Sequence, residues 1–327
     1  MMPMAAFGQG AQARPPWDRV LVTGGAGFLG SRLCARLLDS GVEVDCLDNL
    51  STGRAEKVAH LAGRPGFRFL ERDIAEPGCA EALTGPYDLV LHLAGPSSPA
   101  AGPDRAVEIL DTGSVGTRAA LLVADRDGAR FLLASSPPVF PGDPLGPYGA
   151  CAEAGRFAEA LVAAHAGAHG SNAGIVRLFT CYGPGMRSDD GSVPAAFIEQ
   201  ALAGRPVTVA GDGSRRHSLC YVDDMVDGVL LVAAGRSVRP VDIGGDEEPT
   251  AVEIARRVIE LAGSGSPLEF VDGTGDRPVE PRPATGFAHE IFGWLPRVTW
   301  EEGLERTVAS FRERLDPVPT GPGEWWV

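Results

Sequence analysis

Lysine is almost absent from this sequence. The chain has 327 residues and 29 lysine and arginine residues, of which only Lys57 is a lysine. No lysine therefore stands four residues after a tyrosine anywhere in the chain. Chemistry that depends on a tyrosine and a lysine at that spacing is excluded.

Positive net charge, paired cysteines and long apolar runs are missing as well. A net charge of −14 and a pI near 4.9 argue against nucleic acid as a partner, because phosphate binding needs a basic face. The six cysteines show no C-x-x-C spacing, which favours free thiols in a reducing cytoplasm and no metal site. No run reaches the roughly 18 apolar residues of a membrane span, so no membrane association is expected.

A strand, a glycine-rich turn and a helix follow one another near the N-terminus. Residues 20–23 predict a short buried strand, and residues after 28 predict an amphipathic helix. Between and just beyond them stand Gly24, Gly27 and Gly30 at G-x-x-G-x-x-G spacing. Such a turn offers backbone N–H groups and a helix N-terminus to a diphosphate. We expect Gly24 to make the tight turn, Gly27 to admit the diphosphate, and Gly30 to let helix and strand pack closely.

A carboxylate stands at the distance expected for a ribose contact. The second predicted strand, over 42–47, ends at Asp48, 18 residues after Gly30. A group at about 20 residues grips the adenosine ribose in such folds. An acid there favours NAD, because it would repel the 2′-phosphate of NADP. Asp73, at the end of a strand over 67–71, is placed to bind the adenine amino group.

Strands and helices alternate through the first half of the chain. Further strands are predicted over 87–95, 130–135 and 174–179, and helices over 104–126 and 151–168. This rhythm predicts an α/β fold with a doubly wound parallel (Rossmann) sheet and a ligand at the carboxyl ends of the strands. We divide the chain into a disordered tail at 1–17, a dinucleotide-binding domain at 18–183, an interleaved smaller substrate lobe at 184–315 and a C-terminal tail at 316–327.

The motifs resemble those of the extended short-chain dehydrogenase/reductase family, also called the NAD-dependent epimerase/dehydratase family. The matching runs are Val22–Gly30, Cys46–Arg54, Pro96–Pro99, Tyr182–Pro184, Gly211–Ser214 and Cys220–Asp224. They are most similar to the branch that contains UDP-glucuronate decarboxylase, and the resemblance runs from about 18 to 315. It implies tightly held NAD, a small-molecule substrate of the nucleotide-sugar class, and a homodimer formed by two helices per subunit.

The resemblance assigns residues to two binding sites. The implied cofactor-binding residues are Gly24, Gly27, Phe28, Leu29, Gly30, Asp48, Asn49, Ser51, Gly53, Asp73, Ile74, Leu93, Ala94, Gly95 and Thr112. The implied substrate-binding residues are Ser98, Thr180, Arg187, Val209, Arg216, His217 and Arg282.

The catalytic positions of the family are altered. The family uses a Tyr-x-x-x-Lys pair with a Ser or Thr, in which the lysine lowers the tyrosine pKa and the phenolate takes a proton as hydride leaves to NAD. Gapless reading of 146–159 puts Cys151 at the tyrosine and Gly155 at the lysine. Ser136 keeps the hydroxyl, whereas Pro138 stands for a glutamate of the decarboxylases. Ser136, Cys151 and the nearby Tyr148 are the remaining candidates for proton transfer.

Other substrate positions are altered too, whereas the cofactor positions are intact. Gly113 and Thr180 replace asparagines, Ala210 replaces an aromatic residue, and His217 and Pro281 replace arginines. Three hypotheses follow. The chain is an altered nucleotide-sugar enzyme, with a tailoring role in secondary metabolism as one setting. Alternatively, it is a redox-neutral dehydratase, isomerase or cyclase that uses NAD as a scaffold. The third hypothesis is a non-catalytic binding or scaffold subunit.

Overall fold

A seven-stranded parallel sheet forms the centre of the larger part of the molecule. The computed structural model describes residues 15–95, 103–137, 149–188, 191–272 and 281–315. The strands of this sheet lie in the order β10-β6-β5-β4-β1-β2-β3. Their bounds are β1 Arg19–Thr23, β2 Glu43–Asp48, β3 Phe67–Glu71, β4 Leu89–His92, β5 Arg130–Ser135, β6 Ala173–Leu178 and β10 Val241–Ile243. This is the predicted doubly wound sheet, with its order reversing between β1 and β4.

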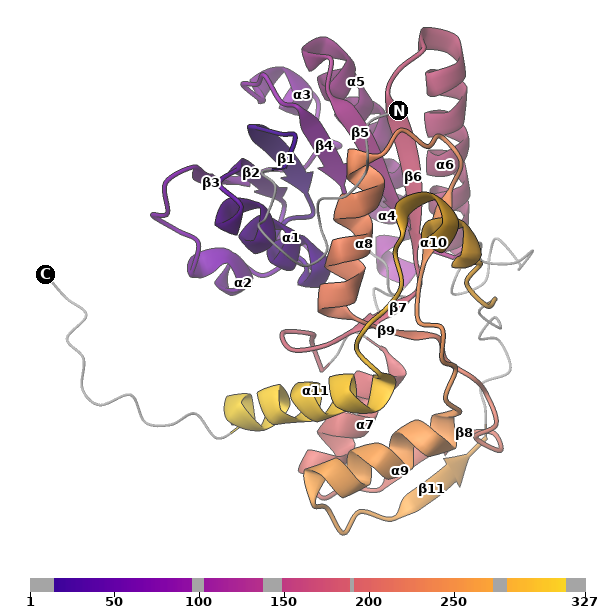
Figure 1. The fold of residues 1–327 in the computed structure, drawn as a ribbon. Helices are drawn as coiled ribbons and strands as arrows, with labels where there is room; N and C mark the ends of the chain where they lie inside the picture. The colour runs from indigo at the N-terminus through magenta and orange to yellow at the C-terminus, as the bar shows by residue number, and fades with distance from the viewer. Residues whose placement is uncertain (1–14, 96–102, 138–148, 189–190, 273–280, 316–327) are drawn as a thin grey trace, which may run out of the picture.

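Helices cover both faces of the sheet (Figure 1). On one face, α1 (Phe28–Asp39), α8 (Val222–Ala234) and α10 (Gly286–Phe292) share a buried apolar cluster with the strands. On the other face, α3 (Cys79–Ala82), α5 (Thr117–Asp127) and α6 (Gly149–His169) form a second cluster. Six of the seven strands are runs of mostly buried residues, as expected for a sheet that is covered on both sides, whereas the edge strand β3 is partly exposed along its length.

The helix predicted over 104–126 exists but contains an irregular turn. It runs through a 3-10 turn at Pro103–Arg105, α4 (Ala106–Asp111), a π-helical turn at Thr112–Gly116, and α5. Strand β4 is shorter than the predicted 87–95. Strand β10, from the second half of the chain, joins the edge of the first sheet beside β6, so the two halves are interleaved.

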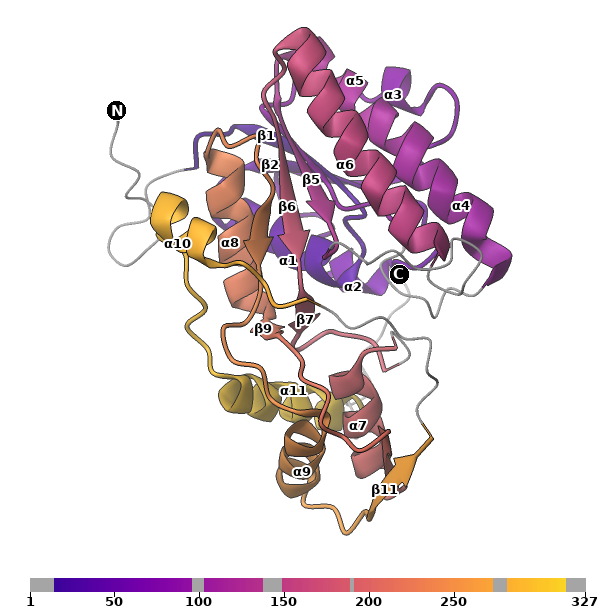
Figure 2. The same cartoon turned by 90° about the vertical axis from the view of Figure 1, so that its right-hand side faces the viewer.

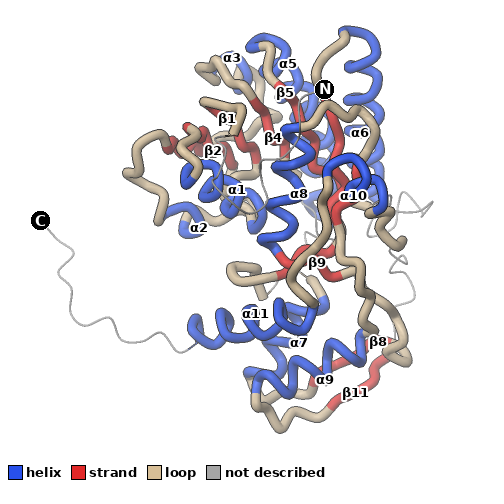
Figure 3. The backbone as a smooth tube through the Cα atoms, viewed as in Figure 1, coloured by secondary structure: helices blue, strands red, loops and turns tan. Residues whose placement is uncertain are grey.

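A smaller lobe lies beyond the carboxyl ends of the strands (Figure 3). It contains α7 (Val193–Leu202), β8 (Val207–Ala210), α9 (Ala251–Ala262), β11 (Leu268–Val271) and α11 (Trp300–Leu315), with a third apolar cluster between them. Two short strands, β7 (Thr180–Tyr182) and β9 (Leu219–Tyr221), pair in parallel at the junction. Within the described ranges, no helix is long and apolar enough to cross a membrane.

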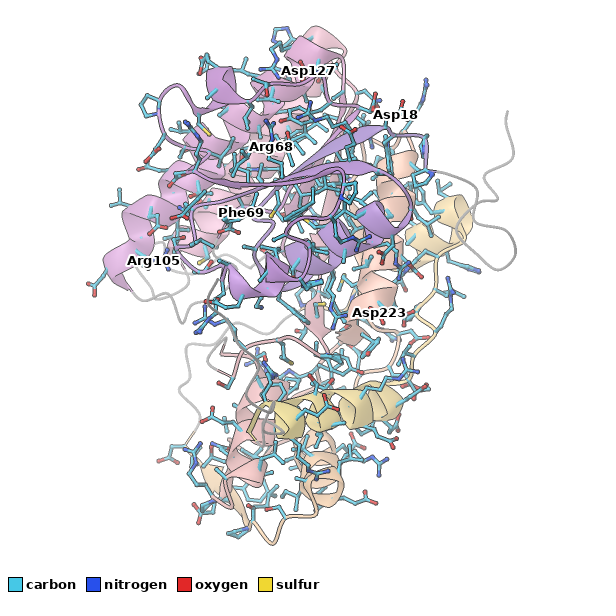
Figure 4. All side chains as sticks on the ribbon, turned by 90° about the vertical axis from the view of Figure 1, so that its left-hand side faces the viewer. Asp18, Arg68, Phe69, Arg105, Asp127 and Asp223 are labelled. Carbon is cyan, nitrogen blue, oxygen red and sulfur yellow. The ribbon has the colours of Figure 1, made fainter. Side chains whose placement is uncertain are left out.

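The carboxyl edge of the main sheet faces the smaller lobe. Figure 4 shows Arg105 and Asp223 near this edge, and Asp18 and Asp127 at the opposite edge. Asp223 is in the first turn of α8 and Arg105 directly precedes α4, so both helices begin at the junction. Loops at this edge are therefore the place where a ligand can contact both parts of the molecule.

Candidate functional site

The glycine turn between β1 and α1 is shaped by close backbone contacts. Gly24 has a φ of +70°, and a Cβ there would lie 2.8 Å from the backbone of Leu93 and Ala94. A Cβ on Gly30 would lie 2.2 Å from the Gly24 carbonyl oxygen. Both positions need glycine for the packing of the turn itself, as the sequence predicts.

The start of α1 is open to an anion. Gly27 is the N-cap in an extended conformation, and Phe28 and Leu29 are the first two helical residues. Among the described residues no side chain caps this helix, and its first turn contains no acid. The first N–H groups of an α-helix have no partner inside the helix and carry partial positive charge. The 12-residue α1 therefore fits the diphosphate of a dinucleotide.

Asp48 is built into the same turn. Its Oδ2 accepts the Ala26 N–H at 2.9 Å, and its Oδ1 accepts the Leu50 N–H at 2.8 Å. Burial raises the pKa of the Asp48 carboxyl, against the opposing effect of these two N–H groups. A Cβ on Gly53 would lie 2.5 Å from Asp48 Oδ1, so glycine lets the loop pass over the carboxylate. Each oxygen keeps a second lone pair, which suits a ribose hydroxyl.

The loop after Asp48 is joined to the end of β3. Asn49 Nδ2 donates to Asp73 Oδ2 at 2.9 Å, and the Ser51 N–H donates to Asn49 Oδ1 at 3.0 Å. Ile74, next to Asp73, is buried and lies against Gly116 of the π-helical turn. The structure thus gathers the predicted residues of β1–β3 into one surface beside the helix N-terminus.

Four further predicted cofactor residues lie on other elements. Leu93 and Ala94 follow β4 and lie against Gly24, and Gly95 has a φ of +149°. Thr112 is buried, and its hydroxyl donates to the Glu108 carbonyl at 2.8 Å within the helix. No group of three or more metal-ligating side chains occurs in the described segments.

The altered centre lies at the end of β5, opposite α6. Ser136 follows β5 directly, and a Cβ on Gly155 of α6 would lie 3.8 Å from Ser136 Oγ. Cys151 precedes Gly155 by four residues and so shares its side of the helix. The structure thus brings Ser136 and Gly155 together. Tyr148 lies outside the described residues, and so does Pro138.

The chemistry of Cys151 is set by its surroundings. Its side chain is half-buried, and burial raises the pKa of the thiol. A thiol with a raised pKa is protonated near neutral pH, whereas a general base must be deprotonated there. The direction of the shift is therefore opposite to the one that base catalysis by Cys151 requires.

The π-helical turn packs tightly on α6 at this centre. A Cβ on Gly113 would lie 2.7 Å from the Cβ of Ala154. The family's asparagine cannot occupy position 113 while the two helices keep this distance. The substitution to glycine is thus matched to the close approach of α6.

His92 is a structural residue next to the cofactor surface. It is 1% exposed, with Nδ1 2.7 Å from Thr23 Oγ1 and Nε2 3.2 Å from Thr117 Oγ1. Burial lowers the pKa of His92 to about 4, so the ring is neutral at pH 7. It links β4 to β1 and to α5.

The predicted substrate residues form two groups. Arg216 Nη1 donates to the Glu248 carbonyl at 2.8 Å, and Arg282 Nε lies 3.5 Å from Glu248 Oε2. His217, adjacent to Arg216, is buried. Arg187 Nη1 instead donates to the Thr52 carbonyl at 2.8 Å, in the cofactor loop.

The remaining substrate candidates contribute little side-chain surface. Val209 is 0% exposed in the apolar cluster of the smaller lobe, so only its backbone can face a ligand. Thr180 begins β7 at the junction, and Ser98 lies outside the described residues. Two other arginines at the junction belong to no motif and were not predicted. Arg105 Nη1 donates to the Ser51 carbonyl at 3.1 Å, and Arg32 Nη2 to the Pro184 carbonyl at 2.7 Å.

The doubly wound sheet, the glycine turn and Asp48 define a dinucleotide-binding α/β protein. A model of the NAD dependent epimerase/dehydratase family matches residues 20–244. The chain therefore belongs to this family, the extended short-chain dehydrogenases/reductases, as its motifs predict.

Individual relatives agree with this assignment. UDP-glucuronic acid decarboxylase 3 of Arabidopsis thaliana is 38% identical over 317 residues, which are 92% of this chain and 91% of that protein. The UDP-glucose 4-epimerase of Thermotoga maritima, solved with UDP-glucose, has a TM-score of 0.80 at 28% identity and covers 91% of this chain and 100% of its own. The dTDP-glucose 4,6-dehydratase of Streptomyces venezuelae, solved with NAD, has a TM-score of 0.82 at 27% identity, with 90% and 97% covered.

Proposed function

We propose that this chain binds NAD at the glycine turn and a nucleotide sugar at the junction of the two lobes, and that it modifies this sugar without a tyrosine–lysine pair. The proposal is carried by a contrast between the two sites. The cofactor site keeps its features, an uncapped N-terminus of α1 beside Asp48, whereas the catalytic site has a glycine, Gly155, facing Ser136 where the family has its lysine. The nucleotide-sugar ligands of similar structures support the substrate class. A tailoring role in secondary metabolism would suit such an altered centre.

The chain's own residues limit the proton transfers that are available. Bound NAD would supply a hydride acceptor. Ser136 can exchange a hydrogen bond with a reacting hydroxyl, but a serine hydroxyl is not a base at neutral pH. Cys151, with its raised pKa, is in the protonated form and acts as a hydrogen-bond donor. Abstraction of a hydroxyl proton is therefore slow, and reactions that need no strong base are favoured.

The glycine at the family's lysine position, which faces Ser136, favours a second candidate function, and the raised pKa of Cys151 agrees with it. In this alternative the chain binds NAD and a nucleotide sugar but transfers no hydride, and it serves as a binding subunit. The two candidates share their ligands and differ only in turnover.

Mass spectrometry of the purified protein tests both candidates. The protein is unfolded in acid and released dinucleotides are identified; UDP-glucuronate and dTDP-glucose are then offered to the intact protein. Conversion of either sugar, or formation of NADH, supports the enzyme. Saturable binding of a sugar without conversion supports the binding subunit. If no dinucleotide is released and none binds on titration, both candidates fail.

We also propose a homodimer through α4, α5 and α6, which lie side by side in Figure 2. Five large apolar side chains on these helices and the π-helical turn are 41–71% exposed: Val107, Leu110, Val115, Leu122 and Phe157. An exposed apolar patch of this kind marks an interaction surface, and a self-complementary patch gives a two-fold dimer.

Light scattering after size exclusion tests the dimer. The variant Leu122→Glu/Phe157→Glu is expected to be monomeric, because two charges would be buried at the interface. Ile291→Glu, at an exposed apolar residue of α10, is the matched control and should leave the dimer intact. A wild-type monomer, or dissociation in the control alone, contradicts the proposal. The free thiols of the structure support a reducing compartment such as the cytoplasm for this assembly.

A further inference from the structure

The only lysine of the chain lies beside the glycine turn. Lys57 belongs to α2 (Glu56–Ala59), and the segment before α2 is fastened to the turn. The Arg54 N–H donates to the Ala26 carbonyl at 3.0 Å, and the Lys57 N–H donates to the Arg54 carbonyl at 3.0 Å. The backbone therefore fixes Lys57 at a defined place relative to the start of α1.

The side chain of Lys57 reaches toward that helix start. Its Nζ lies 5.4 Å from the ring centroid of Phe28, the first residue of α1. An ammonium group over an aromatic face is attracted by the ring, which favours this position over an extended one in solvent. The charge is thus held beside the side chain of the first residue of α1.

Three other basic side chains of this region hold loops in place. Arg32, Arg105 and Arg187 donate to the carbonyl oxygens of Pro184, Ser51 and Thr52, respectively. These contacts fix the loops around the cofactor surface. Lys57 lies over the ring of Phe28, the first residue of α1.

Because the protein is strongly negative, a single cation beside the glycine turn is expected to have a large effect on the binding of an anion there. The chain carries a net charge of −14, and the diphosphate of a dinucleotide adds two negative charges. The partial charge at a helix N-terminus attracts this anion only at short range. A fixed ammonium beside the same turn offsets the repulsion of the whole protein where the anion binds.

Resting on the proposed NAD site, we propose that Lys57 is a positioning residue for the diphosphate of the cofactor, and that acylation of its amine weakens NAD binding. In that modification the ammonium first loses a proton to solvent. The neutral amine attacks the acyl carbon of an activated ester, such as the N-hydroxysuccinimide ester of acetic acid. The new N–C bond forms as the ester C–O bond breaks. N-hydroxysuccinimide leaves as its anion, the nitrogen gives its extra proton to solvent, and the side chain becomes a neutral amide.

The test compares NAD binding by four proteins: wild type, Lys57→Gln as the acyl-lysine mimic, Lys57→Arg, and Arg64→Gln. Arg64 is paired with Asp39 at the far end of α1, so its removal changes the net charge equally at a distant place. Titrations use NAD and adenosine, which lacks the diphosphate. Where NAD copurifies, the rate of exchange with isotope-labelled NAD is measured instead.

Lys57→Gln should weaken NAD binding about three- to tenfold, as expected for one charge near two charges at a half-exposed site. The effect should shrink as salt is added, and adenosine binding should not change. Lys57→Arg should bind NAD like the wild type, and treatment with the acetylating reagent should not weaken this binding. The same variant is the control for acetylation of the α-amino group, which it still contains. Acetylation of the wild type should reproduce Lys57→Gln.

Two results would overturn the role of Lys57. One is NAD binding by Lys57→Gln within twofold of the wild type, and the other is equal weakening by Arg64→Gln. Neither result would contradict the proposed NAD site itself. Failure of the wild type to bind NAD would instead refute the proposed function, so the two failures are distinguishable.

Discussion

The cofactor turn and the altered centre lie at the same edge of one sheet, but their residues are held in different ways. In the turn, a Cβ on Gly24 or Gly30 would strike backbone atoms at 2.8 Å or less, and Asp48 accepts two backbone N–H groups. In the centre, a Cβ on Gly155 would meet Ser136 Oγ at an ordinary contact distance of 3.8 Å.

This difference explains which substitutions the fold tolerates. Gly24 and Gly30 are required by the packing of β1, α1 and the segment after β4, whether or not a dinucleotide is bound. Their presence is therefore weak evidence for NAD. Gly27 is more informative, because its backbone angles suit any residue and a Cβ there has one close neighbour, the Gly24 carbonyl at 3.0 Å. Its glycine is better explained by close approach of a ligand.

The largest expected effect comes from restoring the family's tyrosine and lysine in the altered centre. Cys151→Tyr/Gly155→Lys restores the family's pair on one side of α6, and position 155 has room for a side chain beside Ser136. A positioned acid–base group contributes about 10²- to 10⁴-fold in rate, so hydride transfer from a nucleotide sugar should rise by about that factor. The measurement is NADH absorbance in a single turnover.

Matched variants show whether the pair is responsible. Gly155→Lys alone should gain little, because the lysine acts through the tyrosine. Gly113→Asn should instead unfold or shift α6, since its Cβ would lie 2.7 Å from Ala154. A double variant that is folded and binds NAD but stays inert would show that more than the pair is missing, and the comparison of turn and centre would need revision.

The next effect separates the two roles of the glycine turn. Gly30→Ala should lower the free energy of unfolding by about 3 kcal/mol, the upper range for overpacking, because its Cβ would lie 2.2 Å from the Gly24 carbonyl. Gly27→Ala should cost about 1 kcal/mol or less, the small end of that range, yet weaken NAD binding at least tenfold. Urea unfolding and NAD titration measure the two quantities.

Gly167→Ala provides the control for this pair. Gly167 lies in α6, and a Cβ at this position would have no neighbouring atom within 4 Å. Alanine should therefore stabilise the helix slightly and leave NAD binding unchanged. Equal loss of NAD affinity and of stability in both turn variants would mean that Gly27 serves only the fold.

The sequence predicted the parts of the molecule that depend on local pattern. Buried runs located the strands, and glycine spacing located the turn, because these features are determined by neighbours in the chain. The π-helical turn was not predicted. Gly113 in this turn packs against Ala154 of α6, a contact between distant parts of the chain that no local pattern encodes. The short β4 was also missed. The residues after it look like strand but lie against Gly24 at the turn.

The substrate residues were the hardest to place, for the same reason. Arg187 donates to the Thr52 carbonyl across 135 positions of sequence, and no local pattern encodes such a contact. Val209 is fully buried because alternation along β8 directs its side chain into the apolar cluster of the smaller lobe. The resemblance to the family assigned Arg187 and Val209 to substrate binding only because of their positions in the sequence.

The smallest effect concerns the pH dependence of the cofactor half. His92 has a pKa of about 4 in the folded protein, below its ordinary 6.5. Between pH 6.5 and 4 the unfolded chain therefore binds a proton that the folded protein does not, and stability falls as pH falls. From pH 7 to 5 this one residue should account for about 2 kcal/mol of lost stability. His92→Gln should remove that part of the loss in urea unfolding.

The quantity to compare is the change in the free energy of unfolding with pH. The absolute value differs for another reason, because His92→Gln also loses contacts with Thr23 and Thr117 and should be less stable than wild type at pH 7. His60→Gln, at an exposed histidine, should leave the slope unchanged. Equal slopes for His92→Gln and wild type would show that the ring accepts its proton in the folded state, and that the buried link between β1 and β4 is looser than the turn it supports.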